Sequence, residues 1–303
     1  MSVDLTVDLA GLYLRNPVMP ASGCFGFGKE YSEYYPLNQL GAVVVKATTL
    51  SPRLGNPTPR VAEVTAGMLN AIGLANPGLD KVLEEELPWL SQQDVPVFVN
   101  VAGDTVDEYC EVVQRVSDSN LAQAIELNVS CPNVKLGGLA FGVDATVLRG
   151  LVEAVRKHCT LPLIVKLSPN VTRIQDLALA AAEGGADGLS LINTLIGMQI
   201  DLSARKPLLG NGTGGLSGRA IKPVALRMVY DVAKAVKLPI IGIGGIYSGR
   251  DAAEFIMAGA WAVEVGTANF TDPYACPRII AELASFMEAE GIRDLKEIRG
   301  CAL

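Results

Sequence analysis

The sequence predicts a (β/α)8 barrel formed by a single domain over residues 1–303. Eight short apolar, β-branched segments recur along the chain, and alanine-rich segments of helical character separate most of them. The apolar segments do not alternate strictly with polar residues, as expected of parallel strands buried on both faces. Eight such units in a chain of 303 residues match the length of a barrel. An open doubly wound sheet is the alternative fold.

The predicted elements follow one another in a regular order. The strands are residues 17–22, 42–47, 96–101, 123–128, 162–167, 187–192, 239–243 and 261–265, and helices between them include 104–117, 144–157, 174–184, 221–236 and 249–257. Two connections, 48–95 and 193–220, are longer than a helix requires, so we expect them to cover a functional site. Residues 210–215 fit the pattern G-x-G-x-x-G, but no predicted strand precedes them, which indicates a chance match.

Composition excludes several functional classes. The formal net charge is −7 and no run of Lys or Arg occurs, which argues against nucleic-acid binding and against an anionic membrane surface. No apolar run is long enough to span a membrane, and the N-terminal residues lack the basic region of a secretion signal. The six cysteines form no C-x-x-C pair, so we expect neither a structural zinc nor an iron–sulfur cluster in this chain, and a reducing cytoplasm as its location.

The single histidine narrows the acid–base chemistry. His158 is typical of the polar end of a helix, so triads and metal sites built on histidine are poor candidates. A residue that transfers protons is therefore expected among Cys, Lys, Asp, Glu or Tyr.

The carboxyl ends of the predicted strands carry the polar residues, and in a barrel these ends converge on one mouth. Gly244–Gly245 and Gly266–Thr267 follow the last two strands, and the helix beginning at Gly249 comes next. Their backbone N–H groups predict a phosphate site there. The other polar groups at strand ends are Ser22, Lys46, Asn100, Asn128, Lys166, Asn193 and Thr194.

Lysines and amides among these residues indicate the kind of ligand. Lys46 and Lys166 each interrupt an apolar run, and an ammonium inside a barrel mouth requires a phosphate, a substrate carboxylate or a reduced flavin ring. The alternative is that both lysines reach solvent at a strand end. Several amides around one mouth suit a flat ligand with N–H and C=O groups, and the candidates are Asn70, Asn100, Asn128, Asn133 and Asn193.

One stretch, residues 128–133, combines a strand end with a thiol. Pro132 stops the strand and a loop rich in glycine follows over residues 134–142. We interpret Cys131 as a catalytic thiol on a loop that closes over the mouth. The alternative is a small residue with only a structural role at the strand end.

Four motifs give the sequence a family resemblance over essentially its whole length. They are residues 20–28 (PASGCFGFG), 46–57 (KATTLSPRLGNP), 70–78 (NAIGLANPG) and 128–133 (NVSCPN). In these motifs the chain resembles the class 1 dihydroorotate dehydrogenases, and most closely the catalytic subunit of the NAD-linked class 1B.

The resemblance implies an FMN-containing barrel that oxidises dihydroorotate to orotate in pyrimidine biosynthesis, with Cys131 as the base and Lys46 as a second catalytic residue. By similarity the FMN contacts are Ser22, Lys46, Ala47, Asn100, Asn128, Lys166, Ile192, Gly218, Gly244, Gly245, Gly266 and Thr267. The implied substrate contacts are Lys46, Asn70, Ala71, Ile72, Gly73, Leu74, Asn128, Asn133, Asn193 and Thr194.

The resemblance also implies partners. A homodimer of this chain is expected to associate with an electron-transfer subunit that carries FAD and a 2Fe–2S cluster and reduces NAD+, giving a heterotetramer. Two alternatives remain within flavin barrels, namely the fumarate-linked class 1A enzyme and a module of the dihydropyrimidine dehydrogenase type. A barrel that binds flavin or phosphate without catalysis is the alternative from another class.

Overall fold

The computed structural model, which describes residues 3–129, 135–136 and 139–303, contains a nearly closed barrel of eight parallel strands. The order around the sheet is β3-β18-β17-β12-β11-β8-β7-β4, which confirms the predicted fold. All eight strands fall within the predicted segments: β3 (Val18–Pro20), β4 (Val43–Val44), β7 (Val97–Val101), β8 (Ala124–Asn128), β11 (Leu163–Lys166), β12 (Gly188–Leu191), β17 (Ile240–Ile243) and β18 (Ala262–Val265).

The barrel closes between β3 and β4, the first and last strands of the sheet. The backbone N–H of Gly41 donates to the carbonyl of Val18 at 2.9 Å. A Cβ at position 41 would overlap the carbonyl oxygen of Asn16 and lie 3.2 Å from that of Val18. Glycine is therefore required here because the two backbones approach too closely for a side chain.

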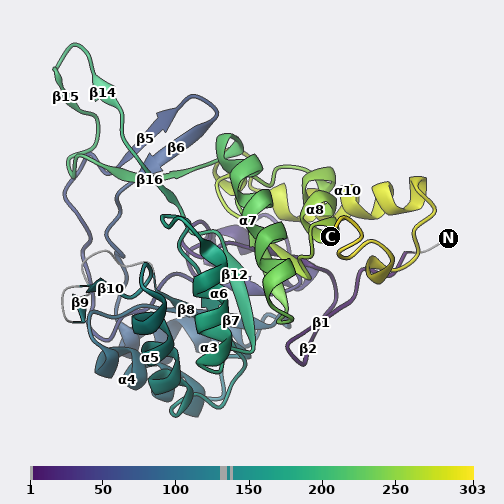
Figure 1. The fold of residues 1–303 in the computed structure, drawn as a ribbon, viewed down its shortest axis with the longest axis horizontal. Coiled ribbons are helices and arrows are strands. Elements are labelled where there is room, and N and C mark those ends of the chain that lie inside the picture. The colour runs from purple at the N-terminus through teal and green to yellow at the C-terminus, as the bar shows by residue number, and fades with distance from the viewer. Residues whose placement is uncertain (1–2, 130–134, 137–138) are drawn as a thin grey trace.

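Helices cover the outside of the strands, and one continuous hydrophobic core joins the two layers (Figure 1). The helix α5 shows how this works. Asp144 caps it by accepting from the N–H of Val147 at 2.9 Å, and its buried face repeats at helical spacing. The main helices are α4 (Val106–Asp118), α5 (Ala145–Arg156), α6 (Ile174–Glu183), α7 (Lys222–Ala235), α8 (Gly249–Met257) and α10 (Ala275–Ala289). All but α10 were predicted.

The two long connections combine into one antiparallel sheet, which the sequence did not predict. Its order is β13 (Leu195–Gly197), β16 (Gly214–Ser217), β6 (Gly67–Asn70) and β5 (Val61–Val64), so strands from both connections pair through β16 and β6. The predicted chance match at 210–215 runs into β16 and opens no helix. A hairpin of β14 (Ile200–Asp201) and β15 (Lys206–Pro207) projects from this sheet, away from the barrel (Figure 1).

Short elements complete the described chain. They are β1 (Val7–Leu9), β2 (Leu12–Leu14), α1 (Lys29–Ser32), η1 (Leu37–Gln39), α2 (Leu79–Lys81), η2 (Val82–Glu86), α3 (Leu87–Leu90), β9 (Lys135–Leu136), β10 (Leu139–Ala140), η3 (Arg219–Ile221), α9 (Ala268–Thr271) and η4 (Leu295–Glu297). Over the described ranges, no helix has the length and apolar character that crossing a membrane requires.

Candidate functional site

The carboxyl ends of the barrel strands carry nearly all of the predicted site residues. Those within or directly after strands are Ser22 (after β3), Lys46 and Ala47 (after β4), Asn100 (β7), Asn128 (β8), Lys166 (β11), Ile192, Asn193 and Thr194 (after β12), Gly244 and Gly245 (after β17), and Gly266 and Thr267 (after β18). Gly218 follows β16, and the segment Asn70–Leu74 begins at the end of β6. Cys131 and Asn133 lie outside the described residues.

Three of the predicted amides form a ladder of side-chain hydrogen bonds. Asn193 Nδ2 donates to Asn128 Oδ1 at 3.2 Å, and Asn128 Nδ2 donates to Asn100 Oδ1 at 3.4 Å. Asn100 Nδ2 in turn donates to Glu126 Oε2. The ladder joins three strand ends and runs from the partly exposed mouth to the buried interior of the barrel.

Lys166 lies at the buried end of this ladder and is paired within the chain. Its Nζ is 3.1 Å from Glu126 Oε2 and 3.0 Å from Glu264 Oε2. Ser190 Oγ also donates to Glu126, at 2.7 Å from Oε1. The expected anionic partner of Lys166 is thus supplied by two carboxylates of the protein itself, because β8 and β18 direct both acids into the barrel interior.

Burial and pairing act in opposite directions on these three groups. Burial raises the pKa of Glu126, but Lys166 and the donated hydrogen bonds outweigh it and hold that pKa below the ordinary value. Burial and then the neighbouring Glu126 raise the pKa of Glu264 well above its ordinary value. Burial lowers the pKa of Lys166, but the two carboxylates outweigh it and raise that pKa. These directions favour one ammonium, one carboxylate and one neutral acid in the cluster.

Lys46 is the unpaired cation of the mouth. No described residue forms an ion pair with its Nζ, and a Cβ built on Gly23 would lie 3.9 Å from this atom. Burial lowers the pKa of Lys46 most, and the nearby guanidinium of Arg60 lowers it further against the opposing effect of Cys24. Two cations without a carboxylate between them favour an anion at this point.

The two glycine turns present backbone donors toward the mouth. Among the described residues, the N–H groups of Gly244, Gly245, Gly266 and Thr267 have no hydrogen-bond acceptor. Gly245 has φ +73°, and a Cβ there would lie 2.7 Å from the side chain of Lys222. Free backbone N–H groups on such turns can bind an anion, and the phosphate site expected from sequence stays a prediction.

The N-terminus of α8, which the sequence suggested as part of the phosphate site, is partly occupied by side chains of the chain. The N–H of Gly249 donates to Glu282 Oε2 at 2.8 Å, and the Ser248 side chain accepts from the N–H of Asp251. Asp251 Oδ2 accepts from the N–H of Tyr247 as well. Side chains of the chain therefore occupy the N–H groups of Gly249 and Asp251, which leaves this helix end fewer donors for an external anion.

The segment Asn70–Leu74 forms a second row of backbone donors. The N–H groups of Ile72, Gly73 and Leu74 have no acceptor among the residues described here. Leu74 has φ +56°, a left-handed conformation that is costly for a leucine. Asn56 holds the segment in place, since its Nδ2 donates to the carbonyl of Ala71 at 3.0 Å.

Sequence reasoning missed Glu126, Glu264 and Arg60. A signal for the two acids was present, because each is the only charged residue in an otherwise apolar predicted strand, as Lys166 is in its own. A buried lysine and buried acids on parallel strands have to meet, since none tolerates burial alone. Arg60 gave no comparable signal within a connection rich in Pro and Gly.

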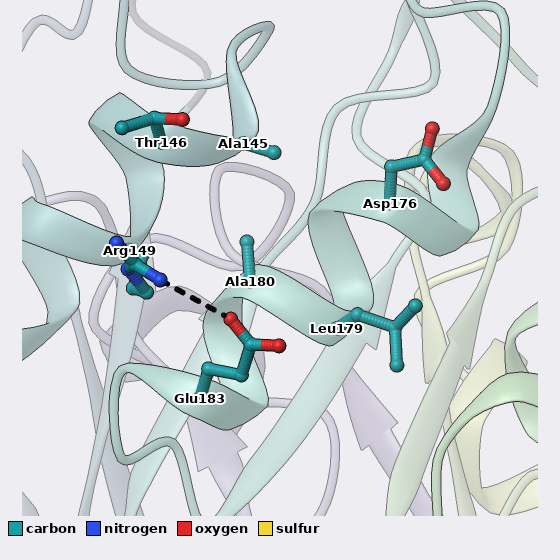
Figure 2. Close-up of a pocket in the computed structure, with 7 residues that line it drawn as sticks. All are labelled: Ala145, Thr146, Arg149, Asp176, Leu179, Ala180 and Glu183. Atoms are coloured by element: carbon teal, nitrogen blue, oxygen red, sulfur yellow. Dashed lines mark hydrogen bonds and ion pairs between the residues drawn. The ribbon is translucent and has the colours of Figure 1, made fainter.

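A pocket between α5 and α6 is separate from this site (Figure 2). It is lined by helix residues only, and an ion pair between Arg149 and Glu183, 3.5 Å long, crosses it. None of the predicted site residues contributes to it, and we assign it no function.

Fold and site together define an α/β barrel whose mouth gathers amide side chains, a lysine and free backbone N–H groups. A family model described as dihydroorotate dehydrogenase matches residues 4–287, and the chain belongs to this family. It is 60% identical over 296 residues to the catalytic subunit of dihydroorotate dehydrogenase B (NAD(+)) from Anoxybacillus flavithermus, covering 98% of this chain and 95% of the relative.

Other comparisons agree. The catalytic subunit of the same name from Geobacillus kaustophilus is 58% identical over 98% of this chain and 95% of its own length. A dihydroorotate dehydrogenase from Eimeria tenella, solved in complex with ferulenol, superposes with a TM-score of 0.81 at 30% identity, covering 98% of this chain and 88% of that one.

Proposed function

We propose that this chain is the catalytic subunit of an NAD-linked dihydroorotate dehydrogenase, which oxidises dihydroorotate to orotate in pyrimidine biosynthesis. The observation that carries the proposal is the convergence of the amide ladder, the unpaired Lys46 ammonium and the two glycine turns on one barrel mouth. The relatives at 58–60% identity bear the name of that enzyme's catalytic subunit.

The residues of the mouth fit FMN. The free N–H groups at Gly244–Gly245 and Gly266–Thr267 suit its phosphate, and positive φ at both Gly244 and Gly245 keeps the turn open. Ile192 packs beside this turn, 3.6 Å from a Cβ built on Gly244. The remaining proposed contacts are Ser22, Lys46, Ala47, Asn100, Asn128, Lys166 and Gly218. When bound, FMN supplies the acceptor for the hydride that leaves the substrate.

The substrate is a ring with one carboxylate and several N–H and C=O groups, and the chain offers a complement to each. The three free N–H groups at Ile72–Leu74 and the Lys46 ammonium suit the carboxylate. Amides of Asn70, Asn128, Asn133 and Asn193, with Thr194, suit the ring edge. The ladder fixes two of these amides before the ligand arrives, which lowers the entropy lost on binding.

Cys131 is the proposed base. It takes the proton from the carbon next to a carbonyl of the ring, while the hydride leaves the adjacent carbon on the opposite face. The thiolate is the reactive form, with an ordinary pKa of about 8.5. Lys46 stabilises negative charge that develops on the ligand in this step.

An anaerobic titration of the purified yellow chain with dihydroorotate tests the function. Loss of the flavin absorption on addition of substrate supports it, and a flavin that stays oxidised contradicts it. The Cys131→Ala variant tests the base in the same experiment. We expect flavin reduction slower by about 10²–10⁴-fold, with orotate binding retained. Reduction at the wild-type rate would remove Cys131 from the mechanism.

We further propose that the chain forms a homodimer and passes electrons to a subunit that carries FAD and a 2Fe–2S cluster and reduces NAD+. The segment from β13 into the projecting hairpin supports a protein interface, because it exposes apolar side chains at Ile196, Met198, Ile200 and Leu202. Rapid turnover with fumarate by this chain alone would favour the class 1A alternative. Turnover with NAD+ only after the partner is added would support the proposal.

A further inference from the structure

We propose that Glu126 is a positioning residue that fixes which end of each amide the site asparagines present to the ligand, and that Glu264 serves it as a neutral, protonated neighbour. The inference extends the proposed function. Only the predicted effect on ligand affinity depends on that function being correct. The supporting observations are the hydrogen bonds of the asparagine ladder and the different numbers of hydrogen-bond donors around Glu126 and Glu264.

The ladder has a direction, and both of its ends enforce the same one. An ionised carboxylate only accepts hydrogen bonds, so Asn100 must turn its NH2 group toward Glu126. Its Oδ1 then faces Asn128 and accepts from the NH2 group there, which leaves Asn128 Oδ1 to accept from Asn193. At the far end, the backbone N–H of Thr194 donates to Asn193 Oδ1 at 2.8 Å.

Reversal of the ladder is therefore costly. It would place the Asn100 oxygen against the Glu126 carboxylate and the Asn193 NH2 group against the Thr194 N–H. Both contacts would set like groups against each other at buried or half-buried positions, and each buried polar group left without a partner costs about 1–3 kcal/mol. In the observed direction, one N–H of the Asn193 side chain remains available to donate to a ligand carbonyl. In a reversed ladder, Asn193 would present its Oδ1 to the ligand instead.

The ladder keeps this direction only if Glu126 stays ionised, and the surrounding donors favour that. Glu126 accepts from Lys166, Ser190 and Asn100, whereas Glu264 has Lys166 as its single donor in the described part of the chain. Glu264 Oε1 is buried and has no hydrogen-bond partner among the described residues.

A single proton resolves the charge of the cluster. Two ionised acids and one ammonium would leave a net negative charge at positions 0–5% exposed, which is strongly unfavourable. The proton goes to Glu264, which accepts from one donor where Glu126 accepts from three. Glu126 therefore stays ionised, and its ionised carboxylate maintains the direction of the hydrogen bonds in the ladder.

Two matched substitutions separate the roles of the acids. Glu126→Gln replaces the acceptor-only carboxylate by an amide that can also donate, so the direction of the ladder is no longer enforced. Glu264→Gln replaces a neutral acid by a neutral amide of the same shape. Asparagine-specific ¹⁵N labelling of the ligand-free protein reports the side-chain amides directly, without cofactor turnover. We expect protected NH2 signals from the ladder in wild type and E264Q, and their loss or averaging in E126Q.

Ligand affinity provides the second readout. We expect E126Q to bind orotate about 10- to 100-fold more weakly and to discriminate less against an analogue in which an amino group replaces a ring carbonyl. E264Q should change both quantities by less than about threefold. Equal effects of the two variants, or intact NH2 signals and affinity in E126Q, would overturn the inference.

Glu126→Asp serves as the conservative rescue, since it keeps an acceptor-only group. It should retain the NH2 signals, and their loss in E126D at unchanged stability would also overturn the inference. Wild-type protein that shows the ladder signals but binds no orotate would instead refute the proposed function while leaving the ladder intact.

Discussion

Replacing Lys166 by Met tests the buried cluster most directly. Methionine has similar length but no charge, so Glu126 would lose the ammonium that now lies 3.1 Å from its Oε2. The side chains of Lys166 and Glu126 are 7% and 1% exposed, so water does not screen the pair. Removal of one partner of a buried ion pair costs about 3–5 kcal/mol, and at an effective dielectric constant of about 20 the attraction at this distance is of the same size.

The assay is urea unfolding of the flavin-free chain, followed by tryptophan fluorescence, so that loss of a cofactor does not enter the comparison. We expect Lys166→Met to lower the free energy of unfolding by about 3–5 kcal/mol near neutral pH. The wild-type pKa of Glu126 is lowered, so its contribution is present above its ordinary value of 4.5 and is lost as the pH falls through the folded-state pKa. The difference between wild type and variant should therefore shrink in acid.

The double variant K166M/E126Q is the control. It removes both charges and leaves Glu264 neutral, so it should recover most of the lost stability. A loss below about 1 kcal/mol in K166M, or a loss that does not shrink as the pH falls from about 7 to below 4.5, would refute the reasoning. A double variant as unstable as the sum of the two single variants would show that the pair is not coupled.

Three further predictions concern other parts of the molecule. Gly41→Ala should destabilise the chain by about 1–3 kcal/mol, because its Cβ overlaps the Asn16 carbonyl at the barrel seam; a change in melting temperature too small to resolve would contradict this. Alkylation should modify the exposed Cys301 but spare Cys276, which is buried and whose pKa is raised by burial; mass spectrometry of peptides decides. Because the pKa of Glu264 is raised, wild type should lose up to about 1.4 kcal/mol per pH unit relative to E264Q as the pH rises above 4.5; parallel stability curves would refute it.

The predicted strands were found because their signal is local. A parallel strand buried on both faces must be apolar along its whole length, and the segment that became β11 shows this in its own residues. Strand ends in a barrel share one face, so the ordinal position of Gly244–Gly245 and Gly266–Thr267 was enough to predict where their N–H groups gather. The predicted strand boundaries were longer than those observed, as at β4, where only Val43–Val44 pair as a strand.

The pairing of the long connections was not local and could not be predicted. Asn70 in β6 pairs with Gly215 in β16 across 145 positions, and neither segment has an alternating pattern strong enough to indicate a strand. The contacts that occupy the N-terminus of α8 could not be predicted for a similar reason. Glu282, which satisfies the N–H of Gly249, lies on α10 and approaches it only after the helices pack.

The sequence by itself determined the barrel, the family and the polar residues that most strand ends carry, because each follows from short segments whose chemistry is complete within a few residues. Only the tertiary structure decided which charges meet. It gave Lys166 two carboxylates of the chain in place of a ligand and aligned the asparagines from Glu126 outward. It also left Lys46 without an ion-pair partner among the residues described. Electrostatic and hydrogen-bond partners depend on distances of about 3 Å between strands remote in sequence, and those distances exist only after the strands have closed into a barrel.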